Sequence, residues 1–204
     1  MVPMPSVDPV GLPAAGGERA DAARNRARIL DATRRLVASQ GIGHVSIPDI
    51  AAAAGVGAGT IYRRFGDRAG LTAALLDEEH RRLQGELIRG RPPLGPGASA
   101  RDRLIAFGHR YLDFLDRHAD LMAASLNDKR PTDPATLVYR QHLTSLLDQA
   151  TTGLDLEYVT ATLLVTLNPV AHRHLRTLPA WPLQRLKDGW TSLIDAWVTG
   201  HQRT

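Results

Sequence analysis

Three small residues, Gly57, Ala58 and Gly59, stand shortly before a tyrosine and two arginines in the stretch GVGAGTIYRRF, residues 55–65. A helix that begins near residue 57 has free backbone N–H groups in its first turn, and the positive end of its dipole points the same way. Small side chains would allow that turn to approach a phosphate backbone closely. Tyr62, Arg63 and Arg64 follow within the next turn of the helix and could offer a hydroxyl and two cations to phosphates or base edges. The chemistry that this stretch predicts is the binding of a nucleic acid.

An excess of positive charge lies in the same part of the sequence. Residues 18–71 contain nine arginines and five acidic residues, whereas residues 72–204 contain sixteen basic and fifteen acidic ones. A local basic excess is the electrostatic footprint of a protein that binds a polyanion, although many solvated helix faces are equally basic. Arg24, Arg26 and Arg28 fit either interpretation, as an arm beside a DNA groove or as a solvated face.

The composition predicts an all-α protein. Leu and Ala dominate, whereas aromatic residues, which strands favour together with β-branched ones, make up only 5% of the chain. Cysteine is absent, so no disulfide or thiolate chemistry is available, which fits a cytoplasmic location. No apolar run approaches the roughly 20 residues that span a bilayer. Residues 1–17 lack the basic start and the apolar stretch of a signal peptide.

Helical periodicity and turn signals divide the chain into three parts. Residues 1–20 are rich in Pro, Gly and Ala without periodicity, which predicts a disordered arm. Residues 21–68 contain three helical patterns, and residues 69–204 contain a larger helical bundle. We expect helices at about 21–40, 47–54, 58–65, 67–87, 99–118, 120–127, 135–151, 154–175 and 182–199.

The second and third of these helices form a helix-turn-helix pattern. Ser46 is a suitable N-cap, Pro48 falls in the first turn, and a tight turn at Gly55 leads to the helix that begins at Ala58. In such a motif the second helix lies in the major groove and presents its N-terminal residues to base edges. Two packed helices without a DNA partner give the same pattern, so the neighbouring tyrosine, arginines and charge favour DNA binding.

Residues 46–71, SIPDIAAAAGVGAGTIYRRFGDRAGL, resemble the DNA-binding domain of TetR-family transcriptional regulators, and the first helix with ILDA at 29–32 also fits. The resemblance covers about residues 24–71. It implies a homodimer that binds a palindromic DNA operator, acts as a repressor, and is released by a small-molecule effector in the C-terminal bundle. The residues that the resemblance assigns to DNA binding are Ser46, Gly57, Ala58, Gly59, Thr60, Tyr62, Arg63, Arg64 and Arg68.

Within this set the resemblance implies separate roles. Ser46 caps the second helix and touches a phosphate, Arg63 occupies the variable base-reading position, and the tyrosine and other arginines contact phosphates. The sequence departs from the family at Gly57, where serine is common, and at Ala58, where a polar or basic residue is common. These departures remove two side-chain contacts and shift the expected base reading toward Arg63, Thr60 and DNA shape.

The C-terminal two-thirds of the chain has apolar stripes but no comparable motif. Ligand sites are usually lined by apolar and aromatic side chains with a few polar tips, although an ordinary core requires the same stripe. The expected effector-binding residues are Phe107, Tyr111, Phe114, Met122, Leu126, Tyr139, His142 and Asn168. Asn168 precedes a proline that interrupts a helical pattern, which predicts either a kink with a freed carbonyl or a helix boundary.

The last two long helical patterns are apolar enough to pack against a second copy of the chain. Trp190 and Trp197 are seven residues apart on one helix face, and large aromatics are enriched in the cores of interfaces. An intramolecular core is the alternative for this face. The expected dimer-interface residues are Leu163, Leu167, Val170, Trp190, Ile194 and Trp197.

An enzyme finds little support in the sequence. It contains no Gly-rich phosphate loop and no nucleophile elbow, and Asp77 and His80 have no second such pair to complete a helical di-metal site. We therefore expect no catalytic residue, no metal and no cofactor. The remaining alternative to a regulator is a helical protein that binds a small molecule and has weak or no specific affinity for DNA.

Overall fold

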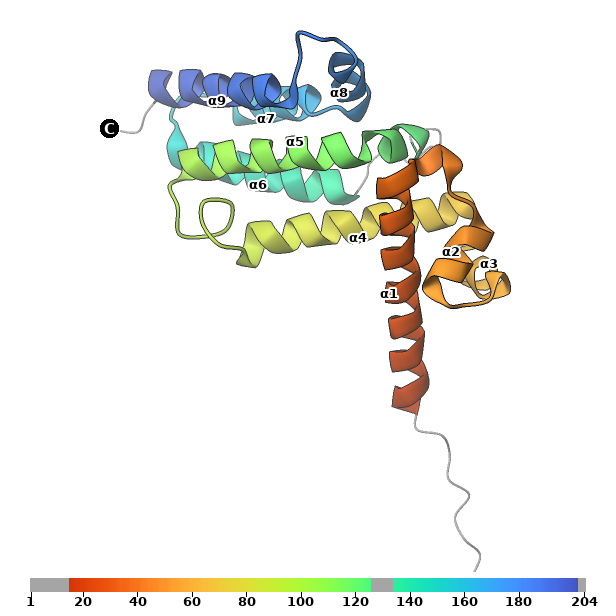
Figure 1. Cartoon of the computed structure of the whole chain (residues 1–204). Coiled ribbons are helices and arrows are strands. Elements are labelled where there is room, and N and C mark those ends of the chain that lie inside the picture. Colours follow the sequence, from red (N-terminus) through yellow and green to blue (C-terminus); the bar gives the residue numbers. More distant parts are fainter. Residues whose placement is uncertain (1–14, 126–133, 202–204) are drawn as a thin grey trace, which may run out of the picture. The chain divides into compact units, whose positions relative to one another are not determined.

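A computed structural model describes residues 15–125 and 134–201, and in these two ranges every regular element is helical (Figure 1). The elements are α1 (Ala15–Gln40), the short 3-10 helix η1 (Ile42–His44), α2 (Ile47–Ala54), α3 (Ala58–Phe65), α4 (Arg68–Arg89), α5 (Ala100–Ser125), α6 (Pro134–Ala150), α7 (Leu156–Thr166), α8 (Pro169–Arg176) and α9 (Leu183–Gly200). The predicted all-α fold class is confirmed. None of the helices within these ranges has the length and apolar character that a membrane span requires.

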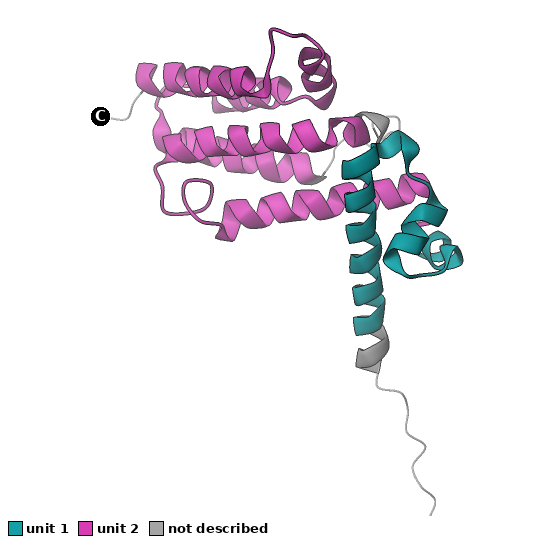
Figure 2. Cartoon of the chain, viewed as in Figure 1, with its two compact units in different colours: residues 1–64 teal, residues 65–204 magenta. Residues whose placement is uncertain are grey.

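Contacts divide the chain into two compact units, residues 1–64 and residues 65–204 (Figure 2). The division falls in the last turn of α3, a few residues before the boundary that the sequence suggested. Of the predicted N-terminal arm, residues 1–14 lie outside the described residues. Helix α1 already begins at Ala15, six residues earlier than expected, because extending an existing helix costs far less than nucleating one.

The core of the first unit joins α1 to α2. Ile29 and Leu30 of α1 are buried, as their periodicity predicted, and the buried Thr33 hydroxyl donates to the Ile29 carbonyl oxygen at 2.7 Å. The buried side chains of α2 recur at positions 47, 50, 51 and 54, which is the i, i+3, i+4, i+7 spacing of one helix face. The opposite face of α2 is exposed to solvent.

Helix α5 is central in the second unit and packs against α4, α6, α8 and α9 (Figure 1). It continues to Ser125 where periodicity suggested two helices, because no Gly or Pro interrupts residues 118–120. Gly108 of α5 lies directly against the Trp190 indole of α9, since a Cβ added there would meet ring atoms at 2.0 Å. The indole N–H donates to the Leu104 carbonyl oxygen at 3.0 Å. Packing therefore requires this glycine, and the tryptophan fixes α9 on the central helix.

The single helix expected at 154–175 is divided into α7 and α8. The Asn168 side chain accepts hydrogen bonds from the N–H groups of Val170 (2.9 Å) and Ala171 (3.1 Å), and so it caps α8. Pro169 occupies the first turn of α8, where its missing N–H leaves no hydrogen bond unmade. The interruption is thus a helix boundary, which was one of the two structures that the sequence allowed.

Candidate nucleic-acid interface

The helix-turn-helix begins with a capping box at the start of α2. The Ser46 Oγ accepts a hydrogen bond from the Asp49 N–H at 3.3 Å, while the Asp49 carboxylate accepts one from the Ser46 N–H at 3.1 Å. The Ser46 hydroxyl also donates to this carboxylate, and these hydrogen bonds from Ser46 hold the pKa of Asp49 below its ordinary value. Ser46 is therefore an N-cap, as predicted. To donate to a phosphate, the Ser46 hydroxyl would have to give up its hydrogen bond to the Asp49 carboxylate.

The turn between α2 and α3 consists of Gly55, Val56 and Gly57. Gly55 has a φ of 62°, in the left-handed region that glycine adopts without strain. The Val56 N–H donates to the Ala51 carbonyl oxygen at 3.0 Å, and the Gly55 N–H donates to the Ala52 carbonyl oxygen at 3.2 Å. This pair of hydrogen bonds is a Schellman motif, which ends α2 sharply and directs the chain into α3.

The start of α3 presents an open surface. The Thr60 N–H donates to the Gly57 carbonyl oxygen at 2.9 Å, so α3 begins directly after Gly57. A Cβ added at Gly57 or Gly59 would meet no described atom of the chain within 4 Å, and neither glycine has a positive φ. The fold therefore requires glycine at neither position, although glycine inside a helix costs roughly 0.5–1 kcal/mol relative to alanine. The first turn of α3 is left accessible to a partner outside the chain.

The remaining side chains of α3 comprise one anchor and an outward-facing set. Ile61 is 1% exposed, and its burial fixes the rotation of α3 about its axis. Tyr62 is 52% exposed, and Arg63 and Arg64 are exposed as well. Within the described residues, Tyr62 and Arg64 make no side-chain hydrogen bond, and Arg63 has only a 3.5 Å contact with the Thr60 hydroxyl. One hydroxyl and two guanidinium groups thus remain available to bind an external acceptor.

Several arginines of α1 are engaged with acidic residues on the same helix. Arg24 forms an ion pair with Asp21, and Arg34 and Arg35 both pair with Asp31. These are exposed pairs of the i, i+3 and i, i+4 type, which contribute little to stability but cancel charge locally. Among the described residues, Arg63 and Arg64 of α3 form no ion pair with an acidic residue, so their charge is not cancelled in this way.

Two other basic residues, Arg28 and Arg68, lie on α1 and at the start of α4. The Arg28 guanidinium donates to carbonyl oxygens at the end of α2, a contact that neither interpretation of this residue from the sequence included. The partners lie 26 and 27 residues away, so local periodicity carries no signal of this contact. Arg68 is the exposed first residue of α4 and belongs to the second unit. Asp67 caps α4 by accepting a hydrogen bond from the Gly70 N–H at 2.8 Å.

Most residues predicted to bind an effector form a packed aromatic cluster in the second unit. Phe107, Phe114 and Tyr139 are at most 1% exposed, and Tyr111 is buried as well. The four rings contact one another with centroid separations of 5.3–5.7 Å, and the His142 ring lies 5.9 Å from Phe107. These residues come together as predicted, but they fill the interior as a core does.

The other three predicted effector residues have different fates. Met122 is half-buried near the end of α5, and Asn168 is occupied as the cap of α8. Leu126 lies outside the described residues. In the part of the chain that the structure describes, no three His, Cys, Asp or Glu side chains gather in a way that could hold a metal ion.

Buried polar atoms lie beside this aromatic cluster. The His80 Nδ1 and the Tyr139 hydroxyl oxygen form a buried hydrogen bond of 2.9 Å. Among the described residues, the Nε2 of His142 and the Nε of Arg103 are buried without a hydrogen-bond partner. Burial, followed by the charge of Arg103, lowers the pKa of His142 to about 4, so this imidazole is neutral at pH 7. Sequence reasoning did not identify Arg103, because only the tertiary structure places its side chain near His142.

The structure divides the residues predicted for a dimer interface. Four of them are at most 4% exposed and belong to the intramolecular core of the second unit: Leu163, Leu167, Trp190 and Ile194. Because these side chains have almost no surface left for a partner, the intramolecular alternative holds for them, and the expectation is corrected. Val170 is 44% exposed and Trp197 is half-buried, so these two retain surface that a second copy could cover.

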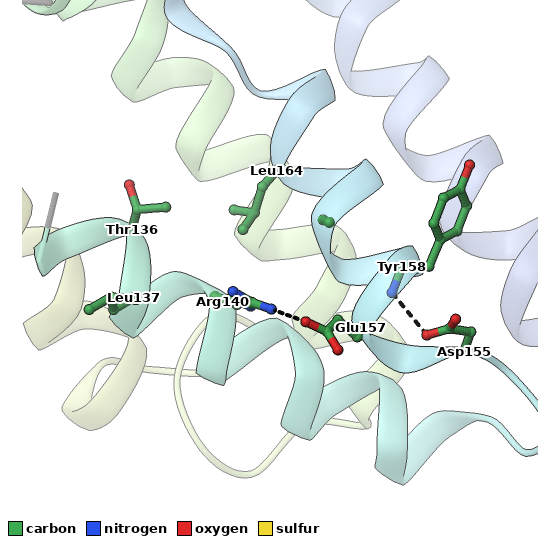
Figure 3. Close-up of a pocket in the computed structure, with 8 residues that line it drawn as sticks. Thr136, Leu137, Arg140, Asp155, Glu157, Tyr158 and Leu164 are labelled. Carbon is green, nitrogen blue, oxygen red and sulfur yellow. Dashed lines mark hydrogen bonds and ion pairs between the residues drawn. The ribbon is translucent and has the colours of Figure 1, made fainter. Parts of the chain in front are cut away.

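An open groove of about 580 Å³ lies between α6 and α7 (Figure 3). It is lined by Thr136, Leu137, Arg140, Asp155, Glu157, Tyr158, Ala161 and Leu164. Arg140 and Glu157 form an ion pair of 2.7 Å between the two helices. Tyr158 is 70% exposed, and Val165, two turns further along α7, is 71% exposed. Because α7 has the sequence LEYVTATLLVT, its apolar side chains extend beyond the face that its own core covers.

Sequence comparison finds relatives that match part of the chain. A family profile described as bacterial regulatory proteins, tetR family, matches residues 29–75, which include α2, the turn and α3. The HTH-type transcriptional regulator TtgR of Pseudomonas putida is 40% identical over 60 residues, which is 29% of this chain and 29% of the relative. The match thus spans less than a third of that relative's length.

Solved structures extend the similarity to most of the chain. A TetR-family transcriptional regulator from Pectobacterium atrosepticum gives a TM-score of 0.70 at 16% identity, covering 91% of this chain and 98% of that one. The transcriptional regulator FadR from Bacillus subtilis, in complex with stearoyl-CoA, gives a TM-score of 0.59 at 18% identity, covering 82% and 96%. At these identities the likeness shows a shared fold. The family profile, for its part, assigns residues 29–75, with the helix-turn-helix, to the tetR family of bacterial regulatory proteins.

Proposed function

We propose that this chain binds a near-palindromic DNA operator as a homodimer in the cytoplasm, represses transcription there, and is released by a small-molecule effector. The observation that carries the proposal is the open start of α3, where two glycines that the fold does not require precede three exposed side-chain donors. Helix N-termini bind phosphate through free N–H groups, and arginine reads guanine in the major groove. The geometry and the donors of α3 fit both tasks.

On this proposal α3 enters the major groove with its first turn toward the duplex. Arg63 and Thr60 lie on one face of α3, with their polar atoms 3.5 Å apart, and they read base edges together. Tyr62 and Arg64 are exposed as well, and they bind phosphates beside these bases. Arg68, at the start of α4, adds a further backbone contact.

Selection of bound sequences from a random duplex library tests the proposal, with wild type and Arg63→Ala compared at the same salt concentration. We expect wild type to enrich a near-palindromic site and Arg63→Ala to lose preference at symmetric positions within it. Each base contact that is lost should cost about 1–3 kcal/mol. If wild type enriches no sequence at moderate salt, the regulator proposal fails, and the chain is better described as a helical protein that binds a small molecule.

The outer face of α7 supports the homodimer. Tyr158 and Val165 are exposed on this face together with Ala161, and Leu137 is exposed on the far side of the adjoining groove. A helix that is apolar on nearly all sides is normally buried on all sides. If a second copy packs its own α7 here, the same set of side chains is buried on both copies, as in a two-fold interface. Val170 of α8 lies next along the chain and extends the exposed apolar surface.

The aromatic cluster supports an effector site inside the second unit. An acceptor-bearing molecule that entered there would satisfy the unpartnered Nε of Arg103 and the Nε2 of His142 while it stacked on Phe107. Because these residues are packed, the molecule must displace side chains. The bound molecule would shift the protein toward a conformation that fits the operator less well. The size of this shift is limited by the difference between the molecule's affinities for this conformation and for the one that binds the operator. Release of the protein from the enriched duplex gives a screen for such molecules, with Phe107→Ala as the variant expected to lose the response.

A further inference from the structure

One side chain of α1 contacts the end of α2 at the turn of the motif. The Arg28 Nη2 donates to the Ala54 carbonyl oxygen at 2.6 Å and to the Gly55 carbonyl oxygen at 3.3 Å. Its Nη1 lies 3.4 Å from the Asn25 Oδ1 on its own helix. The guanidinium thus joins the first helix of the unit to the last residue of α2 and to the first residue of the turn.

The backbone at this point needs such a donor. The Schellman hydrogen bonds of the turn use the carbonyl oxygens of Ala51 and Ala52, which leaves the Ala54 carbonyl, at the end of α2, without an N–H of its own helix. A cation is also favoured at this end by the helix dipole. Gly55 has no side chain in the way, whereas a Cβ there would lie 2.9 Å from the Arg28 Nη2. The glycine and the arginine therefore fit each other.

We propose that Arg28 is a positioning residue, which fixes the turn so that α3 presents its first turn to DNA at one defined angle. The inference rests on the proposed DNA binding. The turn is three residues long and two of them are glycine, so its own side chains restrain α3 weakly. A fixed connection between α1 and the end of α2 supplies the missing restraint. Arg28 then contributes to specificity without touching a base or a phosphate.

The experiment separates positioning from a direct phosphate contact. Three variants are compared with wild type: Arg28→Ala, Arg28→Lys and, as the matched control, Arg24→Ala, which removes a cation from the same helix at a pair with Asp21. Binding is measured against salt concentration on two probes, the duplex enriched by wild type and an unrelated duplex of equal length. Circular dichroism confirms that each variant is folded. Hydrogen exchange of the Gly55, Val56 and Thr60 amides, without DNA, reports on the turn itself.

We expect Arg28→Ala to weaken binding to the enriched duplex about ten-fold or more, the order of one lost base contact, while binding to the unrelated duplex stays unchanged. The slope of log K against log salt also stays unchanged, and the turn amides exchange faster. Arg28→Lys, whose ammonium can still donate to the Ala54 carbonyl, recovers much of the loss. Arg24→Ala behaves as wild type on the enriched duplex.

Other results would overturn the inference. Equal weakening on both duplexes, with a slope reduced by about 0.9 for each phosphate released, would make Arg28 a direct phosphate contact. Unchanged amide exchange in Arg28→Ala would show that the turn does not depend on this side chain. If wild type bound neither duplex, the proposed regulator function would fail. The exchange measurement would then still decide whether Arg28 holds the turn.

Discussion

Replacing Gly59 with alanine should raise the stability of the protein and lower its affinity for DNA. An added Cβ at Gly59 meets no described atom within 4 Å, and the φ of this residue is not positive, so the folded chain accepts a methyl group without strain. Alanine also reduces the conformational entropy that the unfolded chain loses on folding. From these two terms we expect the free energy of unfolding to rise by about 0.5–1 kcal/mol, or roughly 1–4 °C in Tm for a chain of this size.

The effect on DNA binding should have the opposite sign. The methyl group would occupy the space at the first turn of α3 where the backbone approaches the duplex, so at least one close contact is lost in each half-site. The affinity for the enriched duplex should therefore fall roughly ten-fold or more. Gly43→Ala is the matched control, because that glycine also has open space around it and no positive φ, but it lies in η1.

Urea denaturation and fluorescence anisotropy on a labelled duplex measure the two effects on the same preparations. The control should become more stable and keep its affinity. If Gly59→Ala were more stable than wild type and bound DNA equally well, the first turn of α3 would not approach the duplex. If it were less stable, the argument that the fold leaves this position open would be wrong.

Four further predictions follow from individual contacts. Ser46→Ala removes the N-cap of α2 and should lower the free energy of unfolding by about 1 kcal/mol in urea denaturation. Gly108→Ala places a methyl group against the α9 indole and should cost about 1–3 kcal/mol, with a change in tryptophan fluorescence as the ring moves. Val165→Glu puts a charge on the outer face of α7 and should convert a dimer to a monomer in sedimentation velocity while the helical content is kept. Burial lowers the pKa of His118 and of His142 to about 4, so between pH 4 and 6.5 the unfolded chain binds more protons. The free energy of unfolding should therefore have its full value above pH 6.5 and fall as the pH drops through this window. The fall should be less steep in a variant with both histidines replaced by glutamine.

The helix-turn-helix could be predicted almost residue by residue because its signals are local. The cap at Ser46, the left-handed glycine at Gly55 and the start of α3 after Gly57 each depend on residues within a few positions of one another. Asn168 shows the limit of such signals. The Asn-Pro pair marked an interruption, but whether the helix kinked or ended depended on where the asparagine side chain found its donors.

The bundle shows what only the tertiary structure decided. Periodicity placed Trp190 and Trp197 on one apolar face of α9, but it could not say whether that face meets the same chain or another copy. The structure packs Trp190 against Gly108 of α5 and leaves Trp197 partly exposed, while Val165 of α7 is uncovered. An apolar stripe indicates that a helix face is buried, because removing apolar surface from water is favourable whatever covers it. What buries it depends on which elements the whole chain brings together.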